Sequence, residues 1–151
     1  MLRIIAIVVT LLALVLCARF VYLSMTTRAP DTLAESTGRL APCPKTPNCV
    51  SSLATSERHR VEALVVAGDA AAAFERAAEI VATMPGARVV TVDQGYIRAE
   101  FSSRIFRFVD DLELVYDHSV PGFQVRSASR VGRSDLGANR KRVEALRALL
   151  G

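Results

Sequence analysis

The sequence predicts an α+β protein in which an N-terminal transmembrane helix precedes a single domain. Three patterns in the 151 residues indicate this: an uncharged apolar run at the start, two amphipathic segments of helix length, and closely spaced strand segments. Short connections between consecutive strands favour antiparallel pairing. We expect the order β-α-β-β-β-β-α, an antiparallel sheet of about five strands with two helices packed on one face.

The apolar run extends over residues 4–23 and is interrupted only by Arg19. As one helix it is about 30 Å long, the thickness of a bilayer core. Arg19 lies near its C-terminal end, where a long side chain reaches the interface, and Phe20 and Tyr22 suit that interface. We expect residues 1–25 to be a transmembrane signal anchor. A cleaved secretory signal is the alternative, although the residues around position 17 make a poor cleavage site.

Two of the three cysteines flank a turn. Cys43 and Cys49 enclose a segment with two prolines and an asparagine, which favours a turn that brings the two Cα atoms within disulfide range. Reduced thiols and a metal pair are the alternatives, but zinc prefers a closer cysteine spacing. Disulfides persist in oxidising compartments. Positive charge is nearly balanced across the anchor, so the cysteines decide the orientation and place the C-terminal domain in the periplasm.

The remaining chain divides into a linker and a domain. Residues 26–41 are rich in Thr, Ser, Pro and Gly and are expected to be a linker, so the domain covers residues 42–151. Its first predicted elements are a strand at 60–66 and a helix at 69–84, with Asp69 as the N-cap. A Pro-Gly pair ends this helix.

Closely spaced strands and a closing helix follow. The predicted strands are residues 88–92, 96–103, 106–116 and 123–131, with a hairpin turn at Asp93-Gln94-Gly95. The closing helix is expected at 135–150 with Ser134 as the N-cap and an apolar face of Leu136, Val143, Leu146 and Leu150. The sheet face opposite the helices is then wet or covered by a partner.

Charged residues on the last two strands are expected to pair. If these strands are neighbours, Asp111 and Glu113 face Arg126 and Arg130. Such pairs contribute well under ~1 kcal/mol when they are exposed. An exposed surface pairing is therefore the plain interpretation of these four residues.

Asp110 stands on the apolar face of its predicted strand. A buried carboxylate must be paired or neutralised. Ser127, Ser129 or backbone amides near the last helix are its candidate partners. Alternatively, a β-bulge turns the side chain outward.

The segment from residue 126 to residue 147 holds seven Lys/Arg and two acids. Helix N-termini with arginines nearby bind anions, so the start of the last helix is a candidate site for an anionic ligand or lipid headgroup. Asp135 opposes this by placing a carboxylate there, and a solvated or salt-bridged basic surface is the alternative. The candidate cationic contacts are Arg126, Arg130, Arg133 and Arg140.

The stretches CPKTPNCVSS, FVDDLELVYD and VRSASRVGRSDLGANRKRVEAL resemble the family catalogued as domain of unknown function 1499. The similarity runs from about residue 41 to the C-terminus. It implies a bacterial-type domain, often behind a signal or membrane span and with relatives in plastids, and no established reaction. The family pattern falls on Cys43, Cys49, Phe108, Asp110, Asp111, Arg126, Ser127, Ser129, Arg130, Gly132, Ser134, Asp135, Gly137, Asn139 and Arg142, and it slightly favours a binding site among the polar ones.

These observations favour a non-enzymatic binding or assembly module of the cytoplasmic membrane. The sequence matches no phosphate-binding loop, nucleophile elbow or zinc-protease motif, so no catalytic residue, cofactor or metal is expected. The net charge of +4 does not indicate nucleic acid, because acids and bases are interleaved and the anchor argues against it. The expected partners are the membrane and an anionic lipid or membrane protein. The alternatives are an enzyme that uses Asp110 or Asp111 with Arg126 and Arg130, and a structural accessory subunit of a membrane complex.

Overall fold

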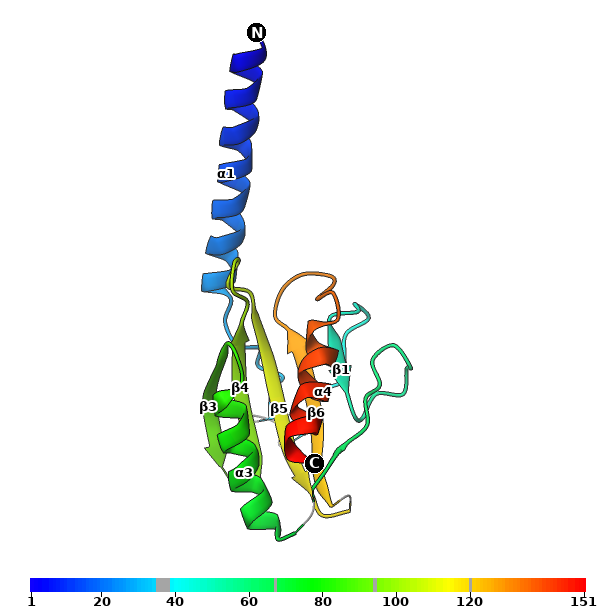
Figure 1. Cartoon of the computed structure of the whole chain (residues 1–151). Helices are drawn as coiled ribbons and strands as arrows, with labels where there is room; N and C mark the ends of the chain where they lie inside the picture. The colour runs from blue at the N-terminus through cyan, green and yellow to red at the C-terminus, as the bar shows by residue number, and fades with distance from the viewer. Residues whose placement is uncertain (35–38, 67, 94, 120) are drawn as a thin grey trace.

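The computed structural model describes residues 1–34, 39–66, 68–93, 95–119 and 121–151, and it confirms the α+β class. Helix α1, Leu2–Thr26, extends away from the domain (Figure 1). Helices α3, Ala70–Thr83, and α4, Ala138–Leu150, cover one face of an antiparallel sheet. Within α1, Leu2–Tyr22 is long and apolar enough to cross a membrane, and none of it is buried in the domain.

The sheet has six strands in the order β1-β6-β5-β4-β3, and β2 also pairs with β6. The strands are β1 Cys49–Ser51, β2 Leu64–Val65, β3 Ala87–Asp93, β4 Tyr96–Ser102, β5 Val109–Asp117 and β6 Gly122–Ser129. The strand beyond the predicted five is β1, which is only three residues long and therefore too short for an alternating pattern. The long strand predicted at 60–66 shortens to β2.

The predicted start of α3 is confirmed, whereas that of α4 is wrong. Asp69 Oδ2 accepts hydrogen bonds from the amides of Ala71 and Ala72, at 3.0 and 3.1 Å. Helix α4 begins at Ala138 because Leu136 and Gly137 have φ angles of 54° and 80°, which no helix accommodates. Ser134 is therefore not the N-cap. Leu136 is 89% exposed and lies outside the apolar face.

The strand predicted at 106–116 also begins later, at Val109. Arg107 has a φ of 56°, which breaks the extended conformation. Residues 103–108 instead form a closed loop between β4 and β5. In the predicted hairpin before β4, Gln94 lies outside the described residues and Gly95 has a φ of 86°.

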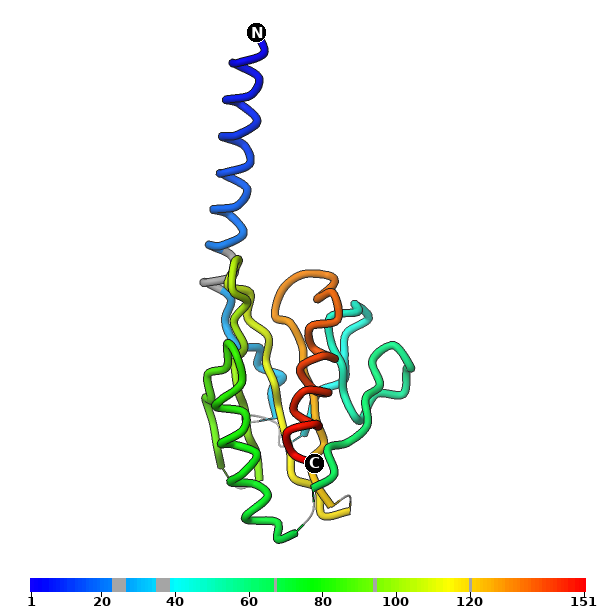
Figure 2. Tube along the Cα trace, in the orientation of Figure 1, coloured from blue at the N-terminus to red at the C-terminus, as the bar shows by residue number. Residues whose placement is uncertain are grey.

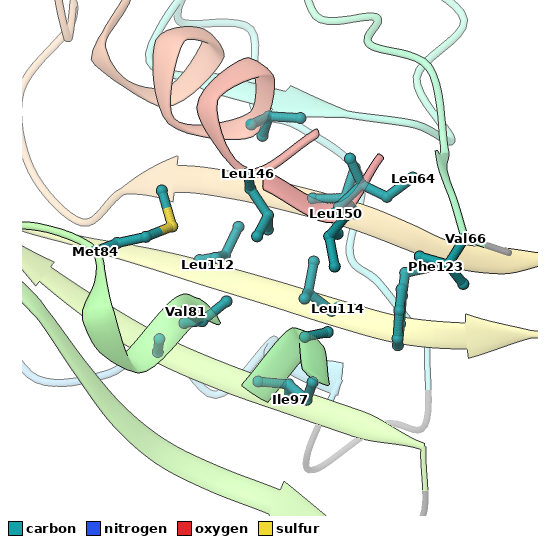
Figure 3. Close-up of a cluster of buried hydrophobic side chains, with 14 of the residues drawn as sticks. Leu64, Val66, Val81, Met84, Ile97, Leu112, Leu114, Phe123, Leu146 and Leu150 are labelled. Atoms are coloured by element: carbon teal, nitrogen blue, oxygen red, sulfur yellow. The ribbon is translucent and has the colours of Figure 1, made fainter. Parts of the chain in front are cut away.

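The hydrophobic core lies between the sheet and the two helices (Figure 3). Leu112 and Leu114 of β5 are fully buried there, together with Val81 of α3 and Leu146 of α4. Phe123 of β6 is the largest fully buried side chain. Along the strands, core residues alternate with residues of the other face, because successive side chains point to opposite faces of a sheet.

Part of the opposite face of the sheet is covered by the chain itself. The segment after α1, residues 27–34, passes over this face (Figure 2), and Leu33 and Ala34 are buried. The amide of Ala34 donates to Glu113 Oε1 at 2.7 Å, and Arg130 Nη1 donates to the carbonyl of Thr27 at 3.2 Å. The described beginning of the expected linker is thus packed on the domain. Residues 35–38 of that linker lie outside the described residues.

Candidate functional site

Most of the polar residues singled out from the sequence belong to two networks, one on each face of the sheet. The outer network lies on the face covered by residues 27–34 and consists of Arg98, Glu100, Asp111, Glu113, Arg126 and Arg130. The inner network lies between the sheet and α4 and consists of Asn48, Asp110, Ser127, Ser129, Asn139 and Arg142. The neighbours Asp110 and Asp111 separate because a strand alternates its side chains.

Asp111 is the centre of the outer network and is only 1% exposed. Arg130 donates to both carboxylate oxygens of Asp111, from Nε to Oδ2 at 2.8 Å and from Nη2 to Oδ1 at 2.8 Å. Arg98 Nη2 donates to the same Oδ1 at 3.2 Å and to Glu100 Oε1 at 3.0 Å. Arg130 Nη2 also donates to Glu100. Two guanidinium groups and two carboxylates therefore neutralise one another under the segment that follows α1.

Glu113 forms the second half of the outer network and is fully buried. It lies opposite Arg126 in the β5–β6 register, and Arg126 Nη1 donates to its Oε2 at 3.1 Å. The hydroxyl of Tyr96 donates to its Oε1 at 3.1 Å, beside the Ala34 amide. The predicted cross-strand pairing is confirmed, but the expectation that these pairs are exposed is wrong, because residues 27–34 cover them.

Two groups of the outer network, Glu100 and Arg130, have pKa values shifted in favour of their charged forms. Burial raises the pKa of Glu100, but hydrogen bonds from Arg130 and Arg88 outweigh it and the pKa is lowered. The hydrogen bond to Asp111 raises the pKa of Arg130, burial opposes this, and the bond to Glu100 adds to the rise. Asp111, Glu113 and Glu100 each bind at least one guanidinium, whereas the buried Nε of Arg126 has no hydrogen-bond partner among the described residues.

Asp110 is buried on the inner face, where its partner is Arg142 of α4. Arg142 Nη2 lies 2.7 Å from Asp110 Oδ2, and the guanidinium stacks 4.4 Å from the ring centre of Phe101. The carboxylate is thus paired with a cation and not with the serines considered from the sequence. It is not turned outward either.

Asn139 connects α4 to β6 and to the disulfide loop. Its Oδ1 accepts from Ser127 Oγ at 2.7 Å, and its Nδ2 donates to Ser129 Oγ at 3.0 Å. Nδ2 also donates to the carbonyl of Asn48 at 3.1 Å. Asn139 is fully buried, so each of these bonds replaces one with water. The serines and the asparagine of the family pattern therefore fasten the helix to the sheet.

Cys43 and Cys49 form a disulfide, with Cα atoms 5.6 Å apart. Inside the loop that it closes, Asn48 Nδ2 donates to the carbonyl of Gly132 at 2.8 Å. His59 is buried and its Nδ1 lies 2.8 Å from the carbonyl of Cys49. The disulfide loop is consequently held against the segment that joins β6 to α4.

The predicted anion site at the start of α4 is not assembled. Arg126 and Arg130 point to the opposite face of the sheet, into the outer network. Arg140 donates to the carbonyls of two residues in the 52–60 segment, at 2.7 and 3.0 Å. Arg133 and Ser134 are exposed on the β6–α4 loop.

The carboxylate of Asp135 already accepts hydrogen bonds from the backbone amides that a bound anion would need. Its Oδ2 accepts from the amide of Asn139 at 2.8 Å and its Oδ1 from that of Gly137 at 3.1 Å. Burial raises the pKa of Asp135, but these amide hydrogen bonds outweigh it and the pKa is lowered. The helix terminus is thus neutralised by the protein's own carboxylate.

A hollow of about 330 Å³ lies next to the inner network. It lies near the end of the domain from which α1 extends, because Ser102 and Ser103 lead into the β4–β5 loop, whose phenylalanines contact Phe20 of α1. The sequence did not single out Lys141, Ser102 or Ser103, since no motif links a helix residue to the end of a strand 39 residues earlier in the chain. The lining residues of this hollow are Met84, Pro85, Phe101, Ser102, Ser103, Asp110, Ala138, Lys141 and Arg142.

A second hollow, of about 360 Å³, lies beside the disulfide. Leu40, Pro42, Leu53 and His59 are among its lining residues. Among the described residues, its lining contains no lysine, arginine or acidic residue. Among the described residues, no three His, Cys, Asp or Glu side chains are grouped as metal ligands.

Comparison with known proteins gives one match. A family model described as "Protein of unknown function (DUF1499)" matches residues 39–150. Neither the curated proteins nor the solved structures gave a match. The matched region contains both networks, the disulfide and the hollow at Lys141, and it excludes α1.

Proposed function

We propose that this chain, which belongs to the family described as protein of unknown function DUF1499, is a membrane-anchored binding module that recognises an anionic lipid headgroup. Helix α1 is its single-pass signal anchor in the cytoplasmic membrane, and the domain faces the periplasm. The disulfide between Cys43 and Cys49 supports this orientation, because an oxidising compartment preserves it.

The observation that carries the proposal is the hollow lined by Lys141, Arg142 and two serines. The ammonium of Lys141 and the serine hydroxyls are donors suited to a phosphate. Asp110 is the one carboxylate among the described residues of the lining, and it pairs with Arg142 at 2.7 Å. Lys141 is exposed and supplies the net positive charge of this hollow.

The position of the hollow fits a lipid ligand. Ser103 lines it and also opens the loop that touches α1, so the hollow lies near the level at which the anchor enters the bilayer. Arg104 and Arg107 of that loop are exposed and add positive potential beside it. Lysines and arginines close to a bilayer attract anionic lipids.

The arrangement argues against the enzyme considered from the sequence. That enzyme requires Asp110 or Asp111 to act with Arg126 and Arg130. Asp110 lies on the opposite face of the sheet from both arginines, and Asp111 is almost completely buried in ion pairs. A binding role for the hollow does not require these aspartates and arginines to lie together.

A titration of the full-length protein in a neutral detergent tests the proposal. Soluble short-chain phosphatidylglycerol and phosphatidylcholine are added separately, and binding is followed by calorimetry. We expect saturable binding of the anionic lipid only, weakened about tenfold or more by Lys141→Glu, since a charge-assisted hydrogen bond becomes a repulsion.

The matched control is Arg76→Glu, which makes the same charge change on α3, outside the lining of the hollow. Arg76 is exposed and its only described side-chain bond is to the carbonyl of Leu149. The Arg76→Glu substitution should leave lipid affinity unchanged. Equal affinity for both lipids, or equal effects of the two substitutions, would contradict the proposed function.

A further inference from the structure

We propose that the β4–β5 loop, residues 103–108, inserts into the membrane interface beside α1 and is a second membrane contact of the domain. This inference rests on the anchor role of α1 in the proposed function. It does not depend on lipid recognition in the hollow at Lys141.

The loop has a fixed shape. The amide of Ser103 donates to the carbonyl of Phe108 at 2.9 Å, and the amide of Phe108 donates back to Ser103 Oγ at 2.9 Å. Arg107 adopts a left-handed φ of 56° next to this closure. The tip of the loop, residues 104–106, is a turn. The hydrogen bonds hold these tip residues outward at the end of the sheet.

The tip carries apolar side chains that the domain does not cover. Ile105 is 79% exposed and Phe106 is 38% exposed. Arg104 and Arg107 flank them and are exposed too. Aliphatic and aromatic side chains bordered by arginines are suited to the boundary between acyl chains and headgroups, where the apolar groups leave water and the cations meet phosphates.

The contacts with α1 set the depth of the loop. The ring of Phe20 lies 6.5 Å from that of Phe106 and 6.3 Å from that of Phe108, centre to centre. Phe20 is two residues before the end of the apolar span Leu2–Tyr22. At about 1.5 Å per residue, Phe20 lies roughly 3 Å inside that end. A loop packed on Phe20 is therefore at the interface of the membrane that α1 crosses.

The lipid bilayer is accordingly the partner that fits this surface. A soluble protein would have to bind at the depth of the anchor's last turn, within the lipid interface. The two attachments together fix the tilt of the domain over the bilayer, and they bring Ser103, shared by loop and hollow, to the headgroup level.

Tryptophan fluorescence tests the inference directly, because the chain contains no tryptophan. The full-length protein with Ile105→Trp is reconstituted in vesicles of phosphatidylglycerol and phosphatidylcholine, with or without bromine on the acyl chains. We expect blue-shifted emission and strong quenching by brominated lipid. Leu149→Trp, at an exposed site in the last turn of α4, is the matched control and should stay unquenched.

A third variant, Leu12→Trp in the middle of α1, separates the two proposals. If its emission is quenched while that of Ile105→Trp equals that of Leu149→Trp, the anchor holds and the loop inference is wrong. If the Leu12→Trp emission is unquenched, the anchor is wrong and the loop inference falls with it. Quenching at both residues 12 and 105 supports the inference.

Discussion

Asp111 of β5 and Arg130, the residue directly after β6, form a two-point ion pair with both N–O distances at 2.8 Å. Arg130 also donates to the carbonyl of Thr27, the first residue after α1. One arginine therefore ties the sheet to the start of the segment that follows α1. The domain is connected to this segment by a side-chain contact as well as by the chain itself.

Asp111→Asn should strongly destabilise the domain. The substitution leaves Arg130 and Arg98 buried without their shared carboxylate, and breaking a buried pair costs about 3–5 kcal/mol. Urea unfolding of the full-length protein in detergent, followed by near-ultraviolet circular dichroism, measures this free energy. Glu62→Gln is the control, because Glu62 is exposed and 3.7 Å from Arg60, and it should cause no measurable change. Similar stabilities for the two variants would argue against a structural role for the outer network.

Asp135→Asn should reduce stability at neutral pH and not in acid. The folded-state pKa of Asp135 lies below its ordinary value of 3.8. Folding therefore favours the ionised form, and this contribution is complete above pH 3.8 and is lost as the pH falls through the folded-state pKa. We expect a loss of about 1 kcal/mol at pH 7, typical of a helix cap.

The measurement for Asp135 is the free energy of unfolding as a function of pH. Ser134→Ala is the control, since the bond described for the Ser134 hydroxyl is an exposed one, accepted from the amide of Leu136 at 3.3 Å. This control should show a small loss that does not vary with pH. A pH-independent deficit in Asp135→Asn would show that its carboxylate charge is not what stabilises α4.

Gly122→Ala should disrupt the pairing of β2 with β6. A Cβ at this position would lie 1.9 Å from the carbonyl oxygen of Leu64, which is backbone and cannot turn away. We expect a loss of about 1–3 kcal/mol, as for other overpacked sites. Gly151→Ala is the control, because its Cβ would meet its nearest atom at an ordinary 3.5 Å. Equal unfolding midpoints in urea would contradict this account of the sheet edge.

Removal of the disulfide should weaken the domain without unfolding it. Cys43→Ser with Cys49→Ser opens a short loop and should cost about 2 kcal/mol in the chain-entropy model. Cys17→Ser is the control and should have no effect, since Cys17 is a free cysteine exposed on α1. Thermal unfolding with and without reductant checks this. Reductant should lower the midpoint of the wild type and leave that of the double variant unchanged.

The sequence predicted the fold wherever a long periodic pattern was present. Alternation along β4, β5 and β6 and the Asp69 cap of α3 gave elements close to those observed. Errors arose where a few residues have left-handed φ angles, at Arg107 and at Leu136. Neither residue is a glycine, so the residue types at these positions did not predict the interruption of the strand or of the helix.

The candidate site was predicted only in part. The strand register places Glu113 opposite Arg126, which alternation alone could anticipate. The burial of this pair could not be anticipated, because it depends on residues 27–34, whose composition is typical of a linker. The ion pair of Asp110 with Arg142 depends on how α4 lies over the sheet, which no local pattern specifies.

A pair of C-terminal fusions tests the central claim, that α1 anchors the chain with its domain in the periplasm. The full-length protein is fused in parallel to alkaline phosphatase, which is active only after export, and to green fluorescent protein, which is fluorescent only in the cytoplasm. We predict an active phosphatase fusion in the membrane fraction and a dark fluorescent-protein fusion. An inactive phosphatase fusion with a bright fluorescent-protein fusion would contradict the account.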